Sequence, residues 1–136
     1  MKAIIGPGTG LGQALLIRHG ESDLYEPFPT EGGHVEFACK KDEDWELVQF
    51  SRDFIANSNN IENRRAKANI TRVSSERLTA GPAVPLIYAF MKKKHPELEA
   101  VLEKTKHFDE IESKDIIGLA MSKKDPLCLK VVEKFT

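Results

Sequence analysis

The chain has 136 residues, the length of at most one ordinary domain, whose core would cover roughly two thirds of the unfolded surface. Its formal net charge is −1, and acidic and basic residues are interspersed, so we expect no nucleic-acid partner and no anionic membrane partner. No apolar stretch reaches the length of a bilayer span, and no secretory signal is evident. The isolated cysteines Cys39 and Cys128 lack zinc-site spacing, which favours reduced thiols in a cytoplasmic protein.

The stretch GPGTGLG, at residues 6–12, places four glycines within seven positions. Glycine at this density serves either positive φ angles or the close approach of another group. Neither common phosphate motif fits, because Gln13 stands where the GxxxxGK[ST] loop needs lysine and the GxGxxG spacing is not met. Apolar runs at residues 3–5 and 14–17 flank the stretch and predict a β-hairpin. Its backbone N–H groups and the Thr9 hydroxyl suit an oxyanion, and a hairpin turn without a ligand is an equally open interpretation.

After this hairpin, residues 25–30 (YEPFPT) are punctuated by proline and predict an extended segment. In the following EGGHVEFA, Val35 and Phe37 alternate with polar residues and predict a short strand. The two glycines before His34 allow a tight turn that directs Glu31 and His34 to one side. Without a ligand, His34 would be a structural histidine at the strand start and Glu31 a solvated loop acid.

From residue 42 the apolar period changes, and a helix is predicted over residues 42–56. Its aromatic residues are assigned to the core: Trp45, Phe50 and Phe54. The polar, asparagine-rich segment at about 57–70 is interpreted as an exposed loop.

Helices are predicted in the remainder of the chain at residues 76–79, 84–94, 97–105, 114–121 and 126–135. The expected N-caps are Ser74 or Ser75, Ser113, and Asp125 followed by proline. The lysines at 92–94 suit a solvated helix end.

The expected organisation is one partial α/β domain, α+β as the chain stands. Residues 1–38 form the hairpin, loop and strand, and residues 39–136 are mainly helical. A sheet of so few strands leaves an open edge, and the last predicted helix has no glycine or asparagine C-cap. We therefore expect the chain to be a segment of a larger protein.

Three blocks, GPGTGLGQALLI, EGGHVEFA and RVSSERLTAGPAVPLIYAF, in this order resemble the glucokinases of the bacterial type in the hexokinase–actin superfamily. The resemblance implies a partial actin-like, ribonuclease H-like sugar kinase fold. It also implies two sets of binding residues: Gly8, Thr9, Gly10 and Gly12 for the ATP phosphates, and Glu31, His34 and Glu76 for glucose. Without the resemblance, Glu76 would be interpreted as a capping-turn acid or a surface partner of Arg77.

The family's reaction transfers the γ-phosphoryl of ATP to the 6-hydroxyl of glucose with Mg²⁺, and a homodimer of the full-length protein is compatible with it. In that family the general base, a first phosphate hairpin and the Mg²⁺-holding carboxylate precede the glycine block. The resemblance therefore assigns no catalytic residue and no metal ligand to this chain, which alone is expected to be inactive. Two alternatives stay open. One is a non-catalytic sugar-binding or interaction module derived from a kinase, and the other is a different hexose kinase of the superfamily.

Overall fold

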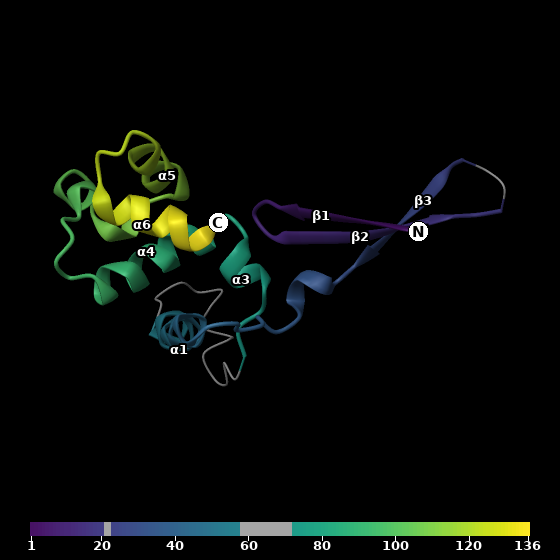
Figure 1. The fold of residues 1–136 in the computed structure, drawn as a ribbon, viewed down its shortest axis with the longest axis horizontal. Coiled ribbons are helices and arrows are strands. Elements are labelled where there is room, and N and C mark those ends of the chain that lie inside the picture. The colour runs from purple at the N-terminus through teal and green to yellow at the C-terminus, as the bar shows by residue number, and fades with distance from the viewer. Residues whose placement is uncertain (21–22, 58–71) are drawn as a thin grey trace.

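The computed structural model describes residues 1–20, 23–57 and 72–136, in which an antiparallel sheet is followed by a group of helices. The sheet extends away from the helices, and only the end carrying the turn between its first two strands lies near them (Figure 1). The predicted order, strands first and helices after, is confirmed. The predicted loop at about 57–70 lies almost entirely outside the described residues.

The sheet has the order β1-β2-β3, with β1 at Lys2–Pro7, β2 at Leu11–Arg18 and β3 at Tyr25–Thr30. The predicted hairpin is confirmed as β1 and β2, in which Gly6 pairs with Gly12. The extended segment after it is a true strand, because β3 pairs with β2 along its whole length. Neither outer edge is paired among the described residues, which agrees with the open edge expected from the sequence.

The strand predicted around Val35 and Phe37 is wrong. The chain instead forms a short 3-10 turn, η1, at Gly32–His34, followed by a single β-bridge between Glu36 and Ser74. Val35 is 57% exposed, so its alternation with polar residues does not reflect a half-buried strand. The bridge nevertheless fixes this segment, because the Ser75 N–H donates to the Val35 carbonyl at 2.8 Å.

The described residues contain five α-helices: α1 at Asp42–Asn57, α3 at Glu76–Thr79, α4 at Ala83–Lys94, α5 at Ser113–Met121 and α6 at Pro126–Phe135. These agree with the predicted helices to within about a residue. The helix predicted at 97–105 is wrong, because this part contains only the 3-10 segment η2 at Val101–Lys104; a further 3-10 turn, η3, spans Phe108–Glu110. The Leu102 N–H is bound by the distant Asp125 carboxylate at 2.9 Å, so it does not join an α-helical ladder.

The predicted cap Asp125 is confirmed, since its carboxylate accepts from the Cys128 N–H at the start of α6. The cap of α5 is Glu112, which forms a capping box with Asp115, and not the predicted Ser113. Ser113 is the first helical residue, and its hydroxyl donates instead to the Gly81 carbonyl at 2.8 Å. Ser75 occupies the cap position of α3 without a capping hydrogen bond from its side chain.

Helix α4 forms the centre of the core and packs against α1, α3, α5 and α6. Its buried side chains include Val84, Ile87 and Tyr88, which are at most 1% exposed. Phe50 and Phe54 of α1 pack against this core as predicted. The assignment of Trp45 to the core is wrong: it is 53% exposed and lies beside the Arg52 guanidinium.

Both cysteines are free thiols, Cys39 exposed and Cys128 buried. Burial, together with the neighbouring Asp125 carboxylate, raises the pKa of the Cys128 thiol to about 12, so this thiol is inert at neutral pH. Among the described residues, no helix combines the length and apolar character needed to cross a bilayer.

The buried Asp125 carboxylate gives a test of this fold. It is fully buried and joins two segments by accepting from Leu102 and Cys128, both at 2.9 Å. Asp125→Ala leaves both buried N–H groups unpaired, and we expect it to lower the free energy of unfolding by about 2–4 kcal/mol. The free energy of unfolding of Asp125→Asn, which keeps one acceptor oxygen, should lie between the values for the wild type and Asp125→Ala. Urea denaturation measures the difference, with exposed Asp109→Ala as control, and equal losses for the two alanine variants would contradict the role.

Candidate functional site

Three side chains that the resemblance assigned to a sugar converge at one place. The His34 imidazole lies between two carboxylates, with Nε2 at 3.4 Å from Glu31 Oε2 and Nδ1 at 3.9 Å from Glu76 Oε1. Glu31 precedes the η1 turn and His34 is its last residue, whereas Glu76 begins α3, 42 residues or more further along the chain. The fold therefore joins these residues, here called the His34 cluster, from two separate segments.

The glycine turn at residues 8–11 lies directly against this cluster. The Leu11 N–H donates to Glu76 Oε2 at 2.9 Å, and the Gly81 N–H donates to the Gly8 carbonyl at 2.8 Å. A Cβ on Gly10 would stand 2.6 Å from Glu76 Oε2, so the carboxylate occupies space that any other residue would need. The predicted phosphate turn and Glu76 are thus neighbours, and the end of the sheet with this turn lies close to α3 (Figure 1).

Close approach, not positive φ, accounts for three glycines at this site, Gly10, Gly32 and Gly33. Among the described glycines the left-handed φ is found at Gly20, outside the site. A Cβ on Gly33 would meet the Leu11 carbonyl oxygen at 2.3 Å, and one on Gly32 would meet the Gln13 side chain at 1.9 Å. Gly33 therefore lets η1 lie on the backbone at the start of β2, and Gly32 leaves room for the Gln13 side chain.

Several supporting groups were not singled out from the sequence. The Arg72 guanidinium donates to the His34 carbonyl, and the Thr30 hydroxyl accepts from the Gly32 N–H while donating to the Gln13 carbonyl. Leu11 contributes its backbone N–H to Glu76. No sequence motif marks such a role, because any residue except proline supplies the same donor.

The His34 cluster is open to water to different degrees. The Glu31 side chain is 89% exposed, His34 is 55% exposed and Glu76 is 31% exposed. Two carboxylates can each accept from adjacent hydroxyls, and the imidazole can donate or accept. This donor and acceptor set suits a ligand with several neighbouring hydroxyl groups and disfavours an anion placed directly on the cluster.

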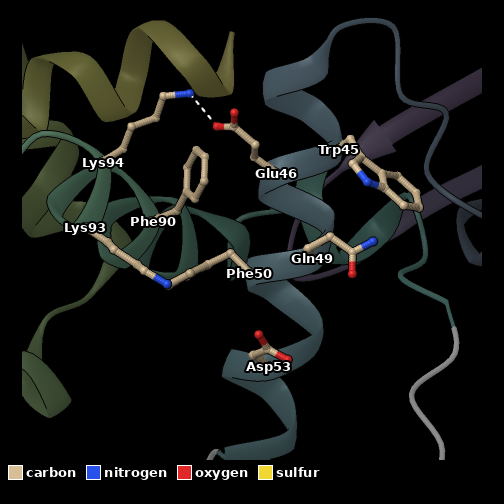
Figure 2. A pocket seen from close by; sticks show the side chains of 8 residues that line it. All are labelled: Trp45, Glu46, Gln49, Phe50, Asp53, Phe90, Lys93 and Lys94. Carbon is tan, nitrogen blue, oxygen red and sulfur yellow. Dashed lines mark hydrogen bonds and ion pairs between the residues drawn. The ribbon is translucent and has the colours of Figure 1, made fainter.

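A separate hollow lies between α1 and α4 (Figure 2). Phe50 and Phe90 line it, and the Lys94 ammonium bonds Glu46 across it at 2.6 Å. None of the residues predicted from the sequence to bind a ligand lies in its lining. The hollow is therefore not part of the site formed by the His34 cluster and the glycine turn.

Comparison with known proteins identifies the family. The family model described as Glucokinase matches residues 1–136, the whole chain. The chain belongs to the glucokinase family. The family predicted from the three sequence blocks is therefore confirmed.

Curated glucokinases share substantial identity with this chain but are much longer. The glucokinase of Helicobacter acinonychis is 33% identical over 135 residues, which are 98% of this chain and 34% of that protein. The glucokinase of Trichormus variabilis is 38% identical over 98 residues, 72% of this chain and 24% of that protein. This glucokinase-family chain thus spans about a quarter to a third of the length of these relatives.

Solved glucokinase structures share the fold. The glucokinase of an Antarctic psychrotroph aligns with a TM-score of 0.62 at 26% identity, covering 98% of this chain and 33% of that one. The Leishmania braziliensis glucokinase aligns with a TM-score of 0.69 at 21% identity, over 98% of this chain and 30% of that one. The predicted fold class, part of an actin-like sugar kinase fold, is confirmed.

The contact between Gly33 and Leu11 gives a test of how this glucokinase-family site is assembled. Gly33 is buried, and a Cβ there would press on a backbone oxygen that cannot move aside cheaply. We expect Gly33→Ala to lower the free energy of unfolding by about 1–3 kcal/mol, as overpacking does. Gly118→Ala is the matched control, because its Cβ would meet nothing within 4 Å and alanine favours the helix. Chemical denaturation compares the two, and an unchanged Gly33→Ala protein would refute the tight contact.

Proposed function

We propose that this chain forms the sugar-binding and phosphate-binding part of an ATP-dependent glucose kinase. The observation that carries the proposal is the convergence of Glu31, His34 and Glu76 beside the glycine turn. Membership of the glucokinase family supports it. So does the fold shared with the Balamuthia mandrillaris glucokinase, solved in complex with glucose, at a TM-score of 0.67 and 18% identity over 98% of this chain and 32% of that one.

Glucose is proposed to bind on the His34 cluster. Glu31 and Glu76 accept hydrogen bonds from ring hydroxyls, and the His34 imidazole donates to or accepts from a third. Because Glu76 also contacts the turn through Leu11, a sugar on this cluster lies next to whatever the turn binds. Fixing the two reactants side by side is the main contribution that a protein makes to phosphoryl transfer.

The phosphates of ATP are proposed to bind at the turn through Gly8, Thr9, Gly10 and Gly12. Thr9 is exposed at the tip of the hairpin, where its hydroxyl can donate to a phosphate oxygen, and the glycines let the phosphate reach the backbone. The described residues hold no group of three side chains suited to a metal ion. Mg²⁺ is proposed to arrive bound to the ATP phosphates, where it would neutralise charge.

We further propose that the two parts of the chain have different roles. Residues 1–38, with Glu76, contact the ligands, and the mainly helical residues 39–136 hold them in place. The general base that receives the proton of the 6-hydroxyl is proposed to lie outside these 136 residues. On this proposal the chain alone binds ligands but forms no glucose 6-phosphate.

The sugar assignment is tested by Glu31→Gln, which keeps the size of the side chain and removes its charge. Because this side chain is 89% exposed, water replaces part of the lost hydrogen bond, and we expect a cost of about 1 kcal/mol, which raises the dissociation constant for glucose about fivefold. NMR titration of the protein with glucose measures it. The control is Glu97→Gln, another exposed glutamate beside a histidine, His95, remote from the cluster. Unaltered glucose binding by Glu31→Gln would rule out a sugar-binding role for Glu31. Wild-type protein that binds no glucose would overturn the proposed function.

The phosphate assignment is tested by Thr9→Val, which keeps the shape and removes the hydroxyl. We expect binding of a non-hydrolysable ATP analogue with Mg²⁺ to weaken about tenfold or more, because one donor to a charged oxygen is lost. Glucose affinity should stay the same. The same NMR titration with each ligand in turn separates the two effects, and the control is Thr105→Val, which removes a hydroxyl that donates to the Leu102 carbonyl. Equal nucleotide affinity in the Thr9 variant and the wild type would leave the turn a purely structural hairpin.

A further inference from the structure

We propose that Arg72 is a positioning residue for the sugar site, which holds the His34 imidazole beside the Glu76 carboxylate. The role of the His34 cluster in binding glucose rests on the function proposed above. The positioning itself rests on two contacts of the described residues. The Arg72 guanidinium donates to the His34 carbonyl, and the chain that follows Arg72 pairs with the chain that follows His34.

A short antiparallel contact between the chain after η1 and the chain before α3 brings His34 and Glu76 together. Its bridge pairs Glu36 with Ser74, and backbone hydrogen bonds of 2.9 and 2.8 Å flank the bridge. Continuing the same antiparallel register by two positions places His34 opposite Glu76. Because a slip of one residue sends every side chain to the other face, this register decides whether the imidazole meets the carboxylate.

The His34 carbonyl lies at the end of this contact and needs a donor from elsewhere. His34 is the last residue of η1, so the turn supplies no N–H for its carbonyl. Within residues 1–20, 23–57 and 72–136, the donor that reaches this carbonyl is the Arg72 guanidinium. A cation with several N–H groups suits the carbonyl end of a helical turn. Arg72 therefore fixes the peptide group of the residue whose side chain faces both carboxylates.

The orientation of the imidazole depends on this peptide group because little else holds the ring. Its nitrogens lie 3.4 Å from Glu31 Oε2 and 3.9 Å from Glu76 Oε1, and both separations exceed the length of an ordinary hydrogen bond. The side chain is 55% exposed, so packing leaves it room to turn. A ring that turns freely must be ordered when a sugar binds, and that loss of rotamer freedom opposes binding. Fixing the backbone at His34 reduces this loss.

The first test compares glucose binding by two variants of Arg72. Arg72→Ala removes the donor to the His34 carbonyl, and we expect the dissociation constant for glucose to rise about three- to fivefold, since water replaces part of this exposed bond. Arg72→Lys keeps a cationic donor and should recover most of the affinity. The control is Arg77→Ala, which removes an equal charge from the exposed residue next to Glu76 and should bind glucose as the wild type does. NMR titration with glucose measures all three.

Two further measurements separate positioning from general support of the fold. If Arg72 acts through the imidazole, Arg72→Ala should cause no further loss of glucose affinity in a His34→Ala protein. Without any ligand, nuclear Overhauser cross-peaks between the His34 ring protons and the side chains of Glu31 and Glu76 should weaken in Arg72→Ala and return in Arg72→Lys.

Equal losses of glucose affinity with and without the His34 side chain would make Arg72 a merely structural residue and would overturn the proposal. Cross-peaks that are the same in Arg72→Ala and the wild type would also overturn it, while the proposed function stands. Wild-type protein that binds no glucose would instead overturn the proposed function, and the cross-peaks of the ligand-free protein would still decide whether Arg72 positions the imidazole.

Discussion

The site depends on the close contact of the hairpin turn, the η1 turn and α3, where glycines leave room for neighbouring atoms. At Gly10, Gly32 and Gly33 an added Cβ would meet a neighbouring atom at 2.6 Å or less, and the neighbours belong to α3 or to the start of β2. The hairpin, the η1 turn and α3 can therefore share one small volume. These contacts accompany the meeting of Glu31, His34 and Glu76, which come from two separate segments of the chain.

The helical part supplies the fixed frame for this contact. Gly81, between α3 and α4, donates to the Gly8 carbonyl, and its own carbonyl accepts from the Ser113 hydroxyl at the start of α5. These hydrogen bonds therefore fix the position of the turn relative to the buried helices. A small, exposed hairpin has little stability of its own, so its attachment to a packed core is what makes a defined ligand site available.

How far the sequence predicts this structure depends on how local each signal is. The hairpin and the start of α6 were predictable, because turn glycines and an Asp125–Pro126 cap act on their immediate neighbours. The helix expected at 97–105 does not form, because the Leu102 N–H donates to the carboxylate of Asp125, more than twenty residues away. Trp45 follows the helical period but faces water, since periodicity identifies a face without showing what covers it.

For the site, the resemblance supplied the side chains and their proposed partners, but the sequence did not reveal how they are arranged. The contact from the Leu11 N–H to Glu76 spans 65 positions and involves a backbone group, which leaves no trace in residue identity. The support of His34 by Arg72 is of the same kind, since its acceptor is a carbonyl. Such contacts become visible only in three dimensions.

The energetic weight of each proposed sugar-binding residue depends on water as much as on geometry. A hydrogen bond formed in bulk water replaces one to solvent and contributes little, whereas the same bond shielded from water contributes more. Glu76, at 31% exposure, is already partly shielded and fixed by Leu11, but Glu31 is 89% exposed. In these 136 residues Glu76 should therefore dominate glucose binding. The contribution of Glu31 should grow wherever additional protein covers the cluster. The longer relatives contain such additional protein, because most of their length lies beyond the matched region.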